Sequence, residues 1–160
     1  MPDPLIPELD VPVIFRQRPI SVPGDLRPAW RISVIVLMLR KCCLQGRSSL
    51  RRLHVLSWAV RDAQVANALV RAIGGETPPD TVLVRIEPAL NRAVDFAIGE
   101  GLLRRQSSDR VELTADGKDF AQDILSNTLV LGYEKQFVER IRFTVTEDFV
   151  KRMFELGVSA

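Results

Sequence analysis

The side chains of this sequence that could do chemistry are few. His54 is the only histidine, and Cys42 and Cys43 are the only cysteines. A histidine beside a nucleophile could act as a general base, and thiolates could attack a substrate or bind zinc. His54 lies between core positions of a predicted helix, with neither a nucleophile nor a metal ligand in view, so we interpret it as structural. The adjacent cysteines fit no disulfide framework and no zinc spacing, which indicates small buried residues in a protein of the reducing cytoplasm.

Two sets of carboxylates could serve as an acid–base pair or as a cation site. Asp95 and Glu100 lie five residues apart and therefore on different faces of a predicted helix. Asp116, Asp119 and Asp123 share one helix face, but they lack the loop geometry and the carbonyl ligands of a calcium site, which indicates a solvated acidic face. No catalytic constellation remains. We expect a protein that is not an enzyme and that holds no cofactor and no metal.

The elements that must position any functional side chain are clearest between Gly101 and Gly117, in the string GLLRRQSSDRVELTADG. A predicted helix over Glu87–Glu100 leads into this string. The pattern then predicts a strand, a polar tip, a second strand and a helix capped by Thr114, with the strands at Leu102–Arg105 and Arg110–Leu113. This order is typical of the second half of a winged helix. We therefore predict a mainly α fold of the α+β class, built around a winged helix-turn-helix domain.

The rest of the chain divides at changes in composition. Seven of the ten prolines fall within residues 1–28, a density that forbids a helix and favours an extended arm. The apolar run Ile32–Leu39 is too short to span a bilayer and predicts a central core helix. We predict three regions: a proline-rich N-terminal arm at 1–27, the winged-helix domain at 28–126 and a C-terminal helical extension at 127–160.

Further elements follow from caps and periodicity. The pattern predicts helices at 29–43, after Ser48 or Ser49, at 62–73 and at 147–156, together with a short strand at Thr81–Arg85.

Positive charge is concentrated near the start of the predicted domain. Residues 31–62 carry seven arginines and lysines against one acid, Asp62, in a chain whose net charge is only +2. Such a basic face suits either a phosphate backbone or an acidic partner surface. For double-stranded DNA we expect non-specific backbone contact through arginines of this region and of the wing. These arginines are Arg47, Arg51, Arg52, Arg104, Arg105 and Arg110.

The helix before the wing argues against sequence-specific DNA readout. In a DNA-binding winged helix this helix enters the major groove, where basic and amide side chains read the bases. Here its non-core positions include Glu87, Asp95 and Glu100 against the single base Arg92. Three carboxylates beside phosphates cost Coulomb energy and forfeit counterion release. The pattern favours a protein partner for this helix.

Apolar side chains near both ends of the chain predict a partner interface, because exposed apolar patches usually mark interaction sites. The alternative is that both ends complete the domain's own core. The side chains that we expect in the interface are Phe15, Phe137, Phe143, Phe149, Met153 and Phe154.

Several strings of the chain resemble the middle components of bacterial ABC-three-component systems, such as Lamassu-type defence against phages and plasmids. The strings are AWRISVIVLMLRKC, SLRRLHVLSWAVR, RIEPALNRAVDFAIGEGLL, VELTADGKDF and VTEDFVKRMFE. The resemblance covers about residues 28–156, and its distinctive portions are LRRLHVLSWAVR and EPALNRAVDFAIGEGLL.

The resemblance implies a non-catalytic winged-helix subunit, similar in architecture to the kite-type partners of bacterial SMC complexes. Such a subunit sits near the heads of an SMC-like or Rad50-like ATPase, links them to an effector nuclease and helps to hold double-stranded DNA without sequence preference. The competing interpretation is a winged-helix transcriptional regulator, which requires a homodimer and a basic recognition helix. A third, an enzyme, requires a site that the sequence does not offer.

Overall fold

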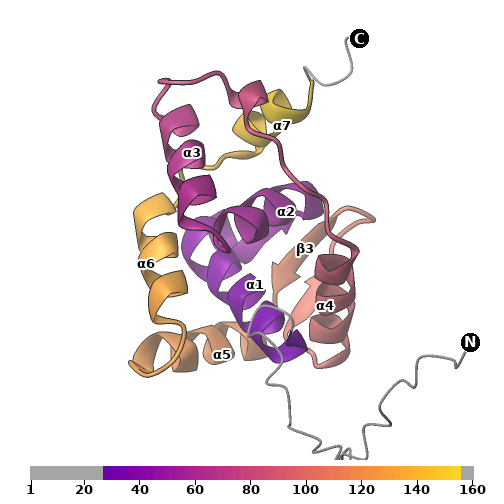
Figure 1. The fold of residues 1–160 in the computed structure, drawn as a ribbon. Helices are drawn as coiled ribbons and strands as arrows, with labels where there is room; N and C mark the ends of the chain where they lie inside the picture. The colour runs from indigo at the N-terminus through magenta and orange to yellow at the C-terminus, as the bar shows by residue number, and fades with distance from the viewer. Residues whose placement is uncertain (1–26, 156–160) are drawn as a thin grey trace, which may run out of the picture.

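A single helix, α1 (Pro28–Cys42), runs through the middle of the molecule in the computed structural model, which describes residues 27–155 (Figure 1). Pro28 occupies the first turn, where its fixed φ suits a helix start. Every side chain from Val34 to Leu39 is buried. The helices α2 (Leu50–Ala59), α4 (Pro88–Gly99), α5 (Ala115–Ser126) and α6 (Gly132–Ile141) all contact α1. The prediction of a central core helix is confirmed.

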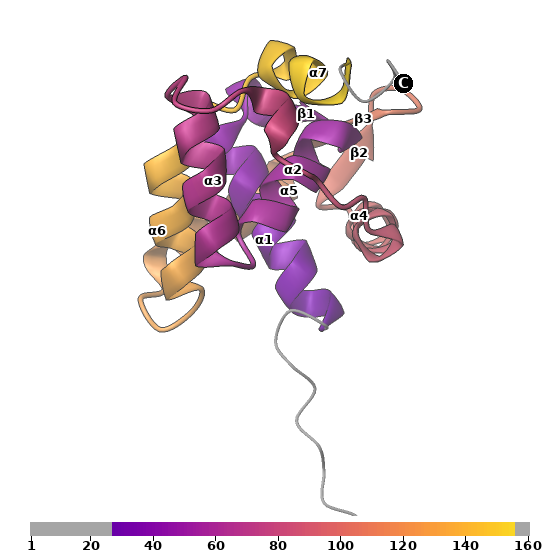
Figure 2. The same ribbon diagram turned by 45° about the horizontal axis from the view of Figure 1, so that its top comes forward.

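Three short strands form one antiparallel sheet in the order β1-β3-β2. They are β1 (Arg47–Ser49), β2 (Leu103–Arg105) and β3 (Arg110–Leu113). β3 lies between its two neighbours. α4 contacts β2, and Figure 2 shows this helix next to the hairpin of β2 and β3. The register places Glu112 of β3 opposite Arg47 on one side and Arg104 on the other. The fold is therefore mainly helical with a small antiparallel sheet, in agreement with the predicted α+β class.

The two strands after α4 and the helix that follows them agree with the sequence-based expectation. Gly101 takes φ +74° where the chain leaves α4, a conformation that glycine adopts without steric cost. The Thr114 hydroxyl accepts a hydrogen bond from the Gly117 N–H at 3.0 Å and so caps α5. A Cβ at Gly117 would lie 2.0 Å from the Leu102 carbonyl oxygen. Only glycine lets α5 approach the start of β2 this closely.

Two elements differ from expectation. β1 was not among the predicted strands; it pairs with β3, and its last residue Ser49 caps α2 by accepting from the Arg52 N–H at 3.1 Å. The predicted strand at Thr81–Arg85 is wrong, because a short 3-10 helix, η3 (Pro79–Thr81), is followed by irregular chain. Val82 is buried there and Leu83 is exposed, so burial alternates along this segment as it does in a strand. The segment nevertheless pairs with none of the three strands.

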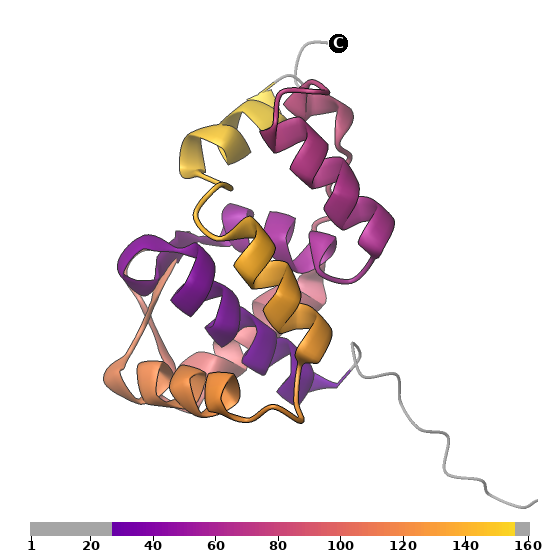
Figure 3. The ribbon, with the colours of Figure 1, turned by 90° about the vertical axis from the view of Figure 1, so that its left-hand side faces the viewer.

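The C-terminal region of the described chain packs into the same core as α1. α6 crosses α1, and α7 (Glu147–Glu155) contacts α2 and η3 (Figure 3). Phe137, Val138 and Ile141 of α6 and Phe149 and Val150 of α7 are buried in one cluster with the central helix. α3 (Ala63–Ile73) completes the body, capped by the Asp62 carboxylate, which accepts from the Gln64 N–H at 2.6 Å.

Candidate interaction surfaces

Of the six arginines predicted to contact DNA, Arg52 is a wrong assignment. It lies in the first turn of α2 on the side that faces the end of α1, and only 6% of it is exposed. Its guanidinium donates a hydrogen bond to the Cys42 carbonyl oxygen at the C-terminus of α1. Arg52 therefore neutralises a helix end inside the protein and offers no surface to a phosphate.

Arg47 and Arg104 share one buried carboxylate. Glu112 is 3% exposed, accepts a hydrogen bond from Arg104 and lies 2.7 Å from the Nε of Arg47. Burial acts to raise the pKa of Glu112, but the hydrogen bonds and charges of Arg104 and Arg47 outweigh it and hold that pKa below its usual range. Both guanidinium groups keep an exposed edge, yet one unit of their joint charge is already balanced.

The remaining arginines of the predicted patch also have partners within the chain. Arg105 lies 2.7 Å from Asp95, and Arg110 lies 3.9 Å from Glu147. The Arg51 guanidinium lies over the Phe154 ring, 5.3 Å from its centroid. The predicted patch is thus spread over the sheet and the start of α2, and three carboxylates balance three of its six charges.

The outer face of α4 is less acidic than the sequence indicated. The expectation that Glu87 faces outward is wrong, because this carboxylate bridges Arg31, at 3.0 Å, and Arg61. Asp95 pairs with Arg105, which leaves Arg92 of α4 and Glu100, the residue that follows the helix, as the charged side chains without a partner among residues 27–155. α4 therefore repels a phosphate backbone less than its sequence predicted.

Large apolar side chains are exposed along α4 and the segment that leads into it, and they indicate the kind of partner more clearly than the charges do. Phe96 is 59% exposed on the helix, while Ile86 and Leu83 before it are 60% and 86% exposed. Asn91, which could read a base edge, is engaged through its side-chain oxygen by the His54 ring at 3.2 Å. This surface carries large apolar groups where a DNA reader carries hydrogen-bond donors.

Half of the predicted partner interface lies in the core. The expectation of exposure is wrong for Phe137, Phe149 and Met153, which are between 4% and 7% exposed. They pack against α1, α2 and their neighbours, so the alternative that the tail completes the chain's own core applies to them. Phe154 is half-buried beneath Arg51, and Phe143 is 48% exposed. Phe15 lies outside the described residues.

His54 joins two helices. The Glu87 N–H donates to His54 Nδ1 at 3.3 Å, and His54 Nε2 donates to the Asn91 side-chain oxygen at 3.2 Å, which fixes the neutral Nε2–H tautomer. Desolvation by burial lowers the pKa of His54, against the opposing effects of Asn91 and Glu87. Both ring nitrogens are thus engaged in holding α2 against the start of α4.

Cys42 and Cys43 are free and buried, and burial raises the pKa of Cys42 to about 12, so this group is a thiol at neutral pH. Within residues 27–155, histidine, cysteine and acidic side chains form no group of three or more that could hold a metal ion.

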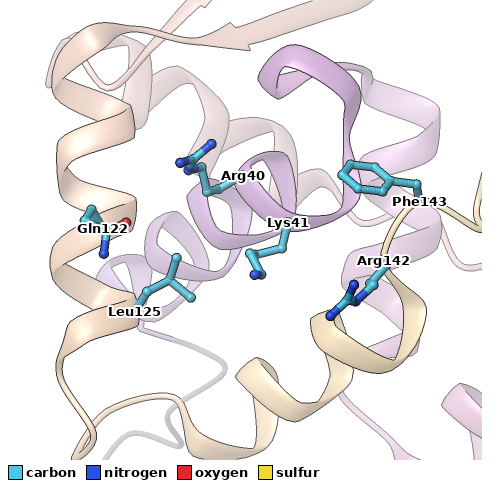
Figure 4. Close-up of a pocket in the computed structure, with 6 residues that line it drawn as sticks. All are labelled: Arg40, Lys41, Gln122, Leu125, Arg142 and Phe143. Atoms are coloured by element: carbon cyan, nitrogen blue, oxygen red, sulfur yellow. The ribbon is translucent and has the colours of Figure 1, made fainter.

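A basic hollow at the C-terminal end of α1 was not predicted from the sequence. Two adjoining hollows, of about 290 and 510 Å³, share Arg40 and Phe143. Figure 4 shows the first, with α1 contributing Arg40 and Lys41 and the end of α6 contributing Arg142. We call this surface the basic groove; its residues are Arg40, Lys41, Arg47, Lys118, Arg142 and Phe143. Only Arg47 and Phe143 were singled out from the sequence, because α1, α5 and α6 meet there only in the folded chain.

Comparisons with protein families, with curated proteins and with solved structures found no match for this chain. In the part of the chain that the structure describes, no helix combines the length and apolar character needed to cross a bilayer.

Proposed function

We propose that residues 28–126 form a winged helix-turn-helix domain that binds other proteins. The order α1, β1, α2, α4, β2, β3 supports the fold assignment, with α3 and η3 inserted before α4. The sheet order β1-β3-β2 also agrees with it. In this arrangement α4 occupies the place of the recognition helix, and the hairpin of β2 and β3 forms the wing.

The exposed apolar groups at α4 carry the proposal of a protein partner. Phe96 and Ile86 are each about 60% exposed, and large apolar and aromatic side chains are the usual anchors of protein interfaces. Arg92 is the one base on the outward face of α4 within the described residues, so the helix offers little to a phosphate backbone. A partner with an apolar groove satisfies this surface better than a DNA major groove does.

We infer the identity of the partner from the resemblance to ABC-three-component systems. On that basis the chain is a non-catalytic subunit of a cytoplasmic bacterial defence complex, joining an SMC-like or Rad50-like ATPase to an effector nuclease. The charged side chains around the wing and α2 then make, at most, non-specific contacts to double-stranded DNA held at the ATPase heads.

Co-expression of the tagged full chain with the products of the two neighbouring genes tests this function. We expect a stable complex that contains an ATPase, and we expect Phe96→Asp or Ile86→Asp to weaken it by about 2 kcal/mol, or roughly 30-fold in Kd. Binding is measured by titrating the purified ATPase against each variant.

Leu129→Asp is the matched control, because Leu129 is 92% exposed but lies between α5 and α6. It should leave the complex intact. An equal loss in the control, or no complex with the unaltered chain, argues against partner binding through α4. Nanomolar, site-specific affinity for DNA at physiological salt would instead identify a transcriptional regulator.

A further inference from the structure

We propose that the basic groove binds single-stranded nucleic acid, with phosphates on its cations and a base stacked on Phe143. The groove shares no residue with α4, so this inference stands apart from the proposed protein-binding function.

The basic groove carries a high density of positive charge. Five basic side chains line the two hollows, and no carboxylate of residues 27–155 does. Arg40 and Lys118 are exposed and make no ion pair or side-chain hydrogen bond within the described residues. Lys41 and Arg142 share one carboxylate, Glu139, at 2.6 and 3.0 Å. Arg47 lies 2.7 Å from Glu112. Glu112 and Glu139 therefore balance part of the charge of the groove, which keeps the unpaired charges of Arg40 and Lys118.

An aromatic ring, that of Phe143, lies among these cations. Phe143 is 48% exposed and borders both hollows. It follows Arg142, whose φ of +45° ends α6, and the Thr144 hydroxyl secures the turn by donating to the Ile141 carbonyl oxygen at 2.6 Å. A non-glycine residue at positive φ costs free energy, and here that conformation ends α6 just before the exposed ring.

The combination of several cations with one exposed ring selects the class of ligand. A single strand presents phosphates and unpaired bases in turn, which matches a basic groove with an aromatic platform. Duplex DNA could reach the cations, but its bases are stacked in the helix and cannot cover Phe143. An acidic peptide would likewise leave the ring without a partner.

Fluorescence anisotropy of a labelled thymidine oligonucleotide of about 20 nucleotides tests the proposal with the full chain. We expect micromolar affinity at low salt and preference for the single strand over a duplex of equal length. Phe143→Ala should weaken single-strand binding about tenfold, since one stacked base is lost, and leave duplex binding unchanged. The double variant Arg40→Glu, Lys118→Glu should weaken it at least about tenfold and make the slope of log Kd against log salt shallower by about 1.4.

Two exposed side chains outside the groove are matched controls. Arg92→Glu reverses an unpaired charge on α4, and Tyr133→Ala removes a ring that is 46% exposed on α6. Both should bind the oligonucleotide as the unaltered chain does, and circular dichroism confirms the fold of every variant. Equal affinity for duplex and single strand together with an inert Phe143→Ala overturns the proposal, as does displacement of the strand by an acidic peptide of equal charge. The α4 variants that disrupt the ATPase complex should bind the strand normally, so either proposal can fail alone.

Discussion

At the scale of single residues, Gly117 decides how closely α5 approaches the sheet. Its missing side chain leaves room for the Leu102 carbonyl group, which a Cβ would meet at 2.0 Å. Both the oxygen and the carbonyl carbon are backbone atoms, so no side-chain rotation relieves the clash. The neighbouring Thr114 holds the same turn by donating to the Gly101 carbonyl oxygen at 2.5 Å.

Gly117→Ala should therefore lower the free energy of unfolding by about 3 kcal/mol, because a methyl group is forced into a packed site. Urea denaturation followed by far-UV circular dichroism measures the change. Gly132→Ala is the control, since Gly132 lies in the first turn of α6 with no atom within 4 Å of an added Cβ. We expect that variant to lie within about 1 kcal/mol of the unaltered chain. Equal losses in both variants would argue against the close contact.

Adjacent arginines show where single-residue prediction stops. Arg51 and Arg52 have the same side chain and the same local sequence, yet one lies over Phe154 and the other is buried against the end of α1. The face of α2 that each occupies depends on where α1 and α7 pack, which local sequence does not state. The same limit applies to Glu87, whose partners Arg31 and Arg61 come from other elements.

At the scale of elements, Glu147 ties the start of α7 to the start of α2. Its two oxygens accept from the Ser49 N–H at 2.9 Å and from the Ser49 hydroxyl at 2.7 Å. Ser49 also caps α2 and ends β1. One carboxylate therefore secures the meeting point of a strand and two helices.

Glu147→Ala should destabilise the protein by about 2 kcal/mol, because it leaves the N–H of the buried Ser49 without its charged partner. In hydrogen-exchange measurements, the amide groups of α7 should lose more protection than those of the other helices. Asp148→Ala serves for comparison: Asp148 shares the first turn of α7 but is exposed, and its loss should cost only about 0.5 kcal/mol of helix-dipole stabilisation. Indistinguishable variants would show that the Ser49 contact adds nothing.

Most elements were predictable because their signals are local. Asp62 and Thr114 cap the helices that the sequence assigned to them, and the hairpin of β2 and β3 needs only neighbouring residues. β1 could not be found in this way, since three residues that include two serines carry no strand pattern and gain their partner, β3, from far along the chain. The basic groove was missed for the same reason.

At the scale of the whole molecule, the C-terminal helices belong to the body. Phe137 is buried in the cluster that contains α1, whereas Phe143, six residues later, is half exposed. Phe137→Ala should cost about 3–5 kcal/mol and Phe143→Ala less than about 1 kcal/mol. Thermal unfolding followed by tryptophan fluorescence and by circular dichroism should give one midpoint for each variant. Two separate transitions would mean that the C-terminal helices do not share the core.

The burial of α1 has a consequence for synthesis on the ribosome. α1 is made first among the described elements, yet it is covered by α4, α5 and α6, the last of which ends at Ile141. About a hundred residues must follow α1 before its cover is complete, which takes roughly 5–20 s at ordinary elongation rates. During that interval an apolar helix emerges without its neighbours, and we expect ribosome-associated chaperones to bind it.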